Sequence, residues 1–79
     1  MQIAFVLIRT RKKVSEIETS VRDARGVKEV HALFGNFQVI TKISGEDELD
    51  LQENIRGLMN VKNIDGTMVL PVIGRGKNG

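Results

Sequence analysis

The chain has 79 residues, with no cysteine, three phenylalanines and neither tryptophan nor tyrosine. A chain of this length forms a single domain, and without cysteine it has no disulfide framework, no thiolate metal site and no thiol nucleophile. Twelve basic and ten acidic residues give a net charge of +2, so no strong positive field indicates a nucleic-acid partner. The longest apolar run, residues 3–8, is far shorter than the roughly 20 residues of a membrane span, and it lacks the flanks of a signal peptide. We therefore expect a small cytoplasmic domain that does not enter a membrane.

The first half of the chain predicts a strand, a helix and a second strand. Residues 3–8 are short, apolar and rich in β-branched side chains, as strands are. After a basic loop, Ser15 and Glu18 have the spacing of a capping box at the start of a helix. Gly26 supplies a left-handed exit from that helix, and residues 28–34 form the next strand. The inner face of the helix carries apolar residues at spacings of three and four: Val14, Ile17, Val21 and Ala24.

The second half of the chain predicts a hairpin, a second helix and a last strand. Gly35-Asn36 is a two-residue turn into a strand at residues 37–43, because glycine tolerates the positive φ that such a turn requires. Asp47 or a neighbour caps the second helix, and the last strand covers residues 67–73. Residues 74–79 are expected to form a flexible tail outside the domain, which spans residues 1–73. The inner face of the second helix is expected to carry Leu51, Ile55, Leu58 and Met59.

The apolar pattern repeats after a shift of 34 positions along the chain. Ile17 then falls on Leu51, and Val27-Lys28 falls on Val61-Lys62. Two βαβ halves predict an α+β fold, the ferredoxin-like βαββαβ sandwich, in which two helices cover one face of a four-stranded antiparallel sheet. Its usual strand order, 4-1-3-2, places the last strand at an edge of the sheet. Pro71 agrees with that position, because proline is tolerated in edge strands.

The first and last strands are apolar at positions that point to both faces of the sheet. A strand with one face in water would alternate between apolar and polar residues, and these strands do not. We assign four residues to the face beneath the helices: Ile3, Phe5, Phe37 and Val39. The other face then exposes an apolar patch, which predicts a homodimer with its sheets stacked face to face. The predicted dimer interface consists of Ala4, Val6, Ile8, Leu33, Ile40, Val69 and Ile73.

Three features together resemble a known family: the order of elements, the run Gly26-Val27-Lys28-Glu29-Val30 and the turn Gly35-Asn36-Phe37. They are similar to the RAM domain (regulation of amino acid metabolism) of the Lrp/AsnC transcription regulators, and the resemblance covers residues 2–73. It implies a non-enzymatic regulatory module without a cofactor, which forms dimers and octamer-like rings and binds an amino acid or a related small effector between subunits. The family's usual regulator carries a helix-turn-helix domain before this one. We therefore expect a stand-alone module with no helix-turn-helix domain and no specific DNA binding of its own. It would bind a small effector at a subunit interface, or co-assemble with full-length Lrp/AsnC regulators and shift their oligomeric state.

The resemblance also implies an effector site near the turn between the second and third strands. The candidate residues there are Gly35, Asn36, Phe37 and Gln38. The amide of Gly35 suits a carboxylate, because glycine lets a ligand approach the backbone closely. Phe34 and Gln38 depart from the family pattern, since they replace a hydroxyl-bearing residue and an acid that would bind an ammonium group. On our face assignment His31 and Thr67 also lie on the open face, where either neighbours or a ligand would satisfy them.

Several alternatives remain open at this point. The same topology occurs in RNA-binding modules, but these stack bases on aromatic rings of the open face, where our assignment places aliphatic residues. It also occurs in ACT-type amino-acid sensors, which commonly pair their sheets side by side. Residues 9–13 hold four basic residues and residues 46–53 hold five acidic ones, which are either solvated ends or contacts between neighbouring dimers. A single histidine cannot make a metal site, and no nucleophile–base pair indicates an enzyme.

Overall fold

The computed structural model describes residues 1–73, so the tail expected at residues 74–79 lies outside the described residues. The elements follow in the predicted order: β1 (Gln2–Arg9), α1 (Val14–Asp23), β2 (Val27–Ala32), β3 (Val39–Gly45), α2 (Glu48–Met59) and β4 (Gly66–Pro71). Within residues 1–73, no helix has the length and apolar character needed to cross a membrane.

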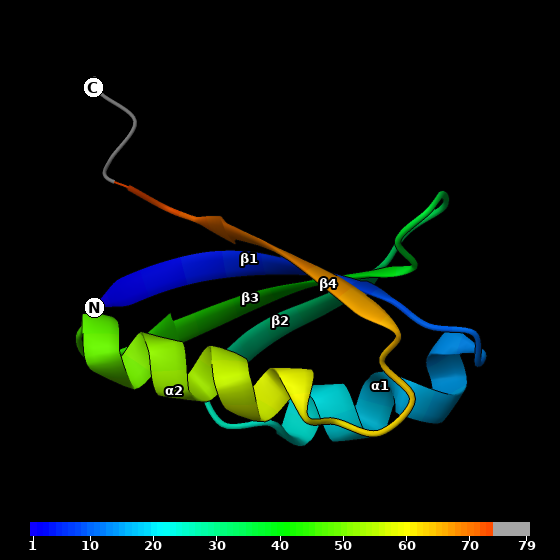
Figure 1. The fold of residues 1–79 in the computed structure, drawn as a ribbon, viewed down its shortest axis with the longest axis horizontal. Coiled ribbons are helices and arrows are strands. Elements are labelled where there is room, and N and C mark those ends of the chain that lie inside the picture. The colour runs from blue at the N-terminus through cyan, green and yellow to red at the C-terminus, as the bar shows by residue number, and fades with distance from the viewer. Residues whose placement is uncertain (74–79) are drawn as a thin grey trace.

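The four strands form one antiparallel sheet in the order β2-β3-β1-β4, which confirms the predicted ferredoxin-like topology. Figure 1 shows α1 and α2 on one side of this sheet, while the loop between β2 and β3 projects toward the other side. We call the side away from the helices the open face. β4 lies at an edge and ends at Pro71, where a missing backbone N–H costs little.

The two helices begin differently from one another. α2 begins as predicted, because the Asp47 side chain caps it by accepting a hydrogen bond from the Asp50 amide at 2.8 Å. The predicted capping box of Ser15 and Glu18 is wrong, because α1 begins at Val14 and its N-cap is Lys13, two residues before Ser15. The Glu16 carboxylate instead accepts a hydrogen bond from the Lys13 amide at 3.3 Å, and Glu18 pairs with Arg22 one turn along the helix.

The faces of β1 are the reverse of those predicted. Ala4, Val6 and Ile8 are fully buried, and they pack into the core beneath the helices instead of forming a dimer interface. The prediction failed because β1 is apolar at every position from residue 3 to residue 8, so its sequence carries no alternation. A shift of one residue then exchanges the two faces of a strand. The side chains that β1 presents on the open face are Ile3, Phe5 and Leu7, each half-buried.

The remaining predicted interface residues fall in three groups. Val69 is also wrong as an open-face residue, because it packs against the core on the helix side. Ile40 does lie on the open face, directly opposite Leu7 of β1. Leu33 and Ile73 are exposed beyond the ends of β2 and β4, so their part in an interface stays a prediction.

The connection between β2 and β3 is longer than predicted. The Leu33 amide donates a hydrogen bond to the Gln38 carbonyl at 2.8 Å, so residues 34–37 form the loop and the two-residue turn is wrong. Gly35 nevertheless has the positive φ expected of it, +122°. A longer loop moves the strand ends, which explains why β2 stops at Ala32 and β3 starts at Val39.

The 34-residue repeat holds for the helices and fails after them. α1 and α2 start 34 positions apart, but Val61-Lys62 lies in the connection to β4 and not in a strand. The inner face of α2 also differs, since Met59 is exposed and Asn54 is buried in its place. The Asn54 side chain donates a hydrogen bond to the Ser44 carbonyl at 2.8 Å, which satisfies both buried groups.

Gly26 is a point where the packing of α2 on β3 tolerates no side chain. Its φ is +88°, and a Cβ there would lie 2.5 Å from both the Ser44 carbonyl oxygen and the Asn54 amide nitrogen. We expect Gly26→Ala to lower the free energy of unfolding by about 2 kcal/mol. The matched variant Gly57→Ala meets no atom within 4 Å and should raise it by about 0.5–1 kcal/mol. Urea unfolding at one fixed protein concentration measures both, and equal effects would contradict the close packing of Gly26 against Ser44 and Asn54.

Candidate functional site

A cavity of about 540 Å3 lies where β1 ends beside the loop between β2 and β3. This volume is within the range of small-molecule sites. We call it the hairpin cavity. Three segments supply its polar lining: the end of β1 with the residues that follow, the β2–β3 loop and the α2–β4 connection. The lining residues are Arg9, Thr10, Arg11, Gly35, Asn36, Gln38 and Asp65. The fold thus brings three of the predicted effector residues, Gly35, Asn36 and Gln38, together in one cavity.

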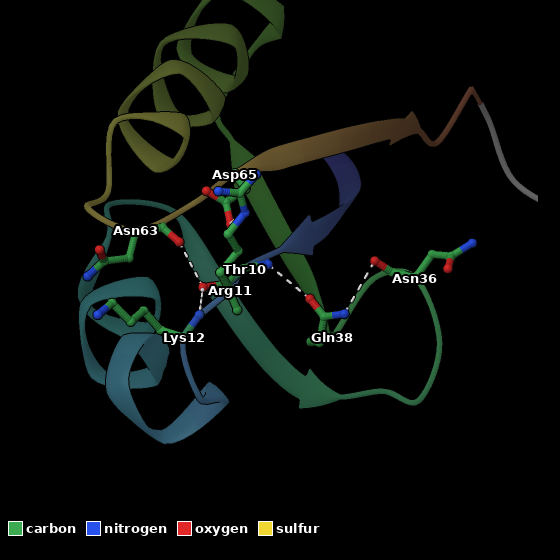
Figure 2. Close-up of polar contacts among 7 residues, drawn as sticks. All are labelled: Thr10, Arg11, Lys12, Asn36, Gln38, Asn63 and Asp65. Atoms are coloured by element: carbon green, nitrogen blue, oxygen red, sulfur yellow. Dashed lines mark hydrogen bonds and ion pairs between the residues drawn. The ribbon is translucent and has the colours of Figure 1, made fainter.

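Gln38 holds the β2–β3 loop against the end of β1. Its side-chain oxygen accepts a hydrogen bond from the Thr10 amide at 2.9 Å, as Figure 2 shows. Its side-chain nitrogen donates to the carbonyls of Gly35 and Asn36, at 3.1 and 3.3 Å. An ionised carboxylate could accept from Thr10 but could not donate to these carbonyls. The departure of Gln38 from the family's acid therefore has a structural role in this chain.

Thr10 is buried in the wall of the cavity, where it links its own β1–α1 loop to the β2–β3 loop and the α2–β4 connection. Its hydroxyl donates a hydrogen bond to the Asn63 carbonyl at 2.8 Å and accepts one from the Lys12 amide at 3.0 Å (Figure 2). Asn63 has a φ of +73°, a left-handed conformation that asparagine tolerates better than most residues. The α2–β4 connection is thereby fixed beside the end of β1.

The charged groups of the cavity come from segments far apart in the sequence. The Asp65 amide donates a hydrogen bond to the Arg9 carbonyl at 2.8 Å, which holds Asp65 beside β1. The Asp65 carboxylate lies 3.7 Å from the Arg11 Nε, a loose pair at the surface. The Arg9 guanidinium lies over Gly66, where a Cβ would approach its Nη2 to 2.8 Å.

Sequence reasoning did not single out Arg9 or Asp65 as site residues. Arg9 appeared only as part of a basic run, and the Asp65-Gly66 pair carries only a turn signal. Nothing local places the two side by side. The antiparallel pairing of β1 with β4, which sets Arg9 opposite Gly66, brings them together.

His31 lies on the open face, away from the hairpin cavity, in a small charged cluster. Its Nε2 is 3.1 Å from the Glu29 Oε1, and the Lys42 Nζ is 3.6 Å from the Glu29 Oε2. The hydrogen bond from His31 and, next, the charge of Lys42 lower the pKa of Glu29 below its usual value. His31 is therefore satisfied by its neighbours, as the sequence analysis allowed.

Two further candidates are not brought to the cavity. Thr67 lies opposite Ile8 in the β1–β4 register, so it shares the helix-side face and its assignment to the open face is wrong. Phe37 is half-buried in the loop and is not part of the cavity lining. Within residues 1–73, no group of three or more metal-ligating side chains is close enough to hold a metal ion.

The open face of the sheet is apolar over β1 and β4. Met68 lies opposite Leu7 and Leu70 lies opposite Phe5, so all four point to the same side. Met68 and Leu70 are 46% and 45% exposed, so nearly half of the surface of each of these large apolar residues is in contact with solvent. The apolar residues of the open face are Ile3, Phe5, Leu7, Ile40, Met68 and Leu70. A patch of this kind on a small domain is typical of an interaction surface.

We expect Gln38→Ala to loosen the hairpin cavity. Without the side-chain amide, the partly buried Thr10 N–H loses its acceptor, and stability should fall by about 1–2 kcal/mol. Amide hydrogen exchange measured by NMR should be faster at Thr10 and in the β2–β3 loop. The control is Asn36→Ala in the same loop, since Asn36 enters the hydrogen-bond network only through its backbone carbonyl. Unchanged exchange at Thr10 in Gln38→Ala would contradict the role given to Gln38.

Comparison with known proteins agrees with this fold. The family model of the Lrp/AsnC ligand binding domain matches residues 3–78. The solved structure of FFRP-DM1 is 25% identical, with a TM-score of 0.84, over 92% of this chain and 100% of that chain. TTHA0845 from Thermus thermophilus is 23% identical, with a TM-score of 0.83, over 95% of this chain and 96% of that chain. No curated protein matches the chain in sequence.

Escherichia coli AsnC has the same fold in part of a longer chain. It is 17% identical, with a TM-score of 0.82, and the match covers 95% of this chain but only 52% of AsnC. The present chain thus spans about half the length of AsnC and the whole length of FFRP-DM1. The family match indicates a non-enzymatic regulatory domain that binds an effector. The sheet topology and the match over residues 3–78 together show that this chain belongs to the Lrp/AsnC ligand-binding (RAM) domain family.

Proposed function

We propose that this chain is a regulatory module that binds a small amino-acid effector in the hairpin cavity and assembles through the open face of its sheet. One observation carries the proposal: the loop at which the sequence predicts an effector forms one wall of a polar cavity. Arginines from the end of β1 line the same cavity. Guanidinium groups bind carboxylates through paired hydrogen bonds, and a carboxylate is common to all free amino acids.

The backbone of the loop adds further hydrogen-bond donors. Among the described residues, the amides of Gly35 and Asn36 donate to no protein acceptor. No atom lies within 4 Å of the position a Gly35 Cβ would occupy, so a ligand can approach the backbone there. These amides support the binding of a carboxylate at the tip of the cavity.

We propose that the module is a homodimer with its sheets stacked face to face. The apolar side chains of the open face would be removed from water in such a dimer, at roughly 25 cal/mol per Å2 of apolar surface. Ile40, which the sequence predicts at the dimer interface, lies on this face and is kept in the proposed interface. The predicted residues that pack beneath the helices are replaced in the proposed interface by Ile3, Phe5, Leu7, Met68 and Leu70.

We propose that dimers associate further into rings through opposite charges. The basic segment 9–13 and the acidic start of α2 lie at opposite ends of the molecule in Figure 1. A contact between the basic segment of one dimer and the acidic start of α2 in the next would pair these opposite charges. Repeated contacts of this kind close into a ring when the rotation between successive dimers adds up to a full turn. An effector that favours one assembly over another would shift the equilibrium by its difference in affinity.

DNA recognition is not assigned to the described domain. We propose no specific DNA binding for residues 1–73, whose two helices both contribute residues to the core and pack on the sheet. We propose that the module acts through full-length Lrp/AsnC regulators, by co-assembly in the cytoplasm that they share. The RNA-binding alternative gains little, because the described strands place only two rings on the open face: Phe5 is half-buried, and His31 is engaged by Glu29.

The effector proposal is tested by thermal unfolding with each of the twenty amino acids, together with light scattering on the same samples. At least one L-amino acid should raise the Tm and change the mass of the assembly. A ligand at about 100 times its Kd stabilises the folded state by about 2.7 kcal/mol. The D-enantiomer of the same amino acid is the matched control and should have a smaller effect. If none of the twenty changes either measurement, the proposed effector class is refuted.

The assembly proposal is tested by two variants that place the same charge on exposed leucines. Leu70 is 45% exposed on the open face, and Leu49 is 66% exposed on α2. Leu70→Arg should convert the dimer to a monomer at micromolar concentration, because it would bury an unpaired charge between the sheets. Leu49→Arg should leave the dimer intact, because Leu49 lies at the acidic start of α2 and not between the stacked sheets. Sedimentation velocity measures both, and a wild-type monomer or a dimeric Leu70→Arg variant would refute the stacked sheets.

A further inference from the structure

We infer that the effector of the hairpin cavity is an acidic amino acid, a ligand with two carboxylates and one ammonium group. The inference rests on the proposed function and narrows its ligand. It follows from three charged side chains that the fold places around one cavity: Arg9, Arg11 and Asp65.

The net charge of the lining favours a ligand of net charge −1. Two guanidinium groups and one carboxylate give the cavity a formal charge of +1. A zwitterion with an uncharged side chain would leave one cation uncompensated, and a basic amino acid would add a further cation. An acidic amino acid balances the lining, with one carboxylate for each arginine and its ammonium group for Asp65.

Arg9 is available to bind a carboxylate. Over residues 1–73 its guanidinium makes no ion pair and no hydrogen bond with another side chain, although it lines the cavity. Gly66 leaves room for it, because any Cβ at that position would lie 2.8 Å from the Arg9 Nη2. A guanidinium without a partner among the described residues can donate two parallel hydrogen bonds to one carboxylate of a ligand.

Asp65 supplies the acid that Gln38 lacks. The Gln38 side-chain oxygen already accepts a hydrogen bond from the Thr10 amide, and its nitrogen donates to carbonyls of its own loop. Gln38 is therefore a poor acceptor for the ammonium group of a ligand. Asp65 reaches the same cavity from the α2–β4 connection. Its distance of 3.7 Å from Arg11 is longer than a hydrogen bond, so a ligand can separate the two and bind both.

The test is isothermal titration calorimetry on the full chain with pairs of ligands matched in shape. L-Glutamate and L-aspartate should bind at least about tenfold more tightly than L-glutamine and L-asparagine. This ratio corresponds to the free energy of one charge-assisted hydrogen bond. Glutarate, which keeps both carboxylates and lacks the ammonium group, should also bind more weakly than L-glutamate. Equal affinity for L-glutamate and L-glutamine, or for L-glutamate and glutarate, would overturn the inference.

Three variants test the assigned roles. Arg9→Gln should reduce the affinity for L-glutamate about tenfold and that for L-glutamine less, whereas Asp65→Asn should reduce the affinity for L-glutamate and spare that for glutarate. Gly66→Ala should weaken L-glutamate binding with little loss of Tm, because only the flexible end of Arg9 must move. Lys28→Gln, the same change of charge at an exposed residue of β2 outside the cavity, is the control and should bind as wild type does.

The outcomes separate this inference from the proposed function. Preference for a neutral or basic amino acid would refute the inference and leave the regulatory module standing. Failure to bind any amino acid would refute both. Selective binding of L-glutamate or L-aspartate that Arg9→Gln leaves unchanged would overturn the assignment of Arg9.

Discussion

The central strand β1 is apolar at every position from residue 3 to residue 8, and such a strand has to be covered on both faces. The helices cover one face, where Ala4, Val6 and Ile8 are wholly removed from water. Within the described chain no element covers the other face, so part of the apolar surface of β1 and β4 stays in contact with solvent (Figure 1). A second sheet stacked on the open face is the simplest structure that satisfies both demands.

The same strand also positions the proposed effector site. β1 ends at Arg9, and the next residue, Thr10, holds the β2–β3 loop and the α2–β4 connection through its amide and its hydroxyl. The core, the proposed interface and the hairpin cavity are therefore parts of one continuous strand and its extension. A ligand bound in the cavity would contact a segment that is packed into the core, and packed segments of this kind can carry coupling between a site and an assembly.

In the cavity, a residue that departs from the family pattern takes a structural role, while another residue supplies the negative charge. Gln38 replaces an acid of the family pattern and uses both ends of its amide to brace the loop. The negative charge that this replacement removes is present again in Asp65, on a different segment and a short distance away in space. Charge in a binding site is a property of the cavity as a whole, because electrostatic attraction depends on distance and not on which segment carries the group.

Local patterns in the sequence were enough to predict the class and order of the elements, the edge position of Pro71, the cap at Asp47 and the loop that bears Gly35. These features depend on local patterns: apolar spacing along a helix, a capping side chain, a glycine that allows positive φ. The residues also carried the family resemblance, since its motifs are short and contiguous. The prediction that Gly35, Asn36 and Gln38 lie at an effector site comes from this resemblance.

The tertiary structure alone decided which face of β1 is buried and which residues complete the cavity. A uniformly apolar strand has no period, so only its packing against α1 and α2 could place Val6 inside and Phe5 outside. Arg9 and Asp65 became neighbours only when β1 paired with β4, and no local signal records a contact between segments so far apart in the chain. The length of the β2–β3 loop was decided in the same way, because the Gln38 side chain, by bonding to Thr10, anchors the loop to β1.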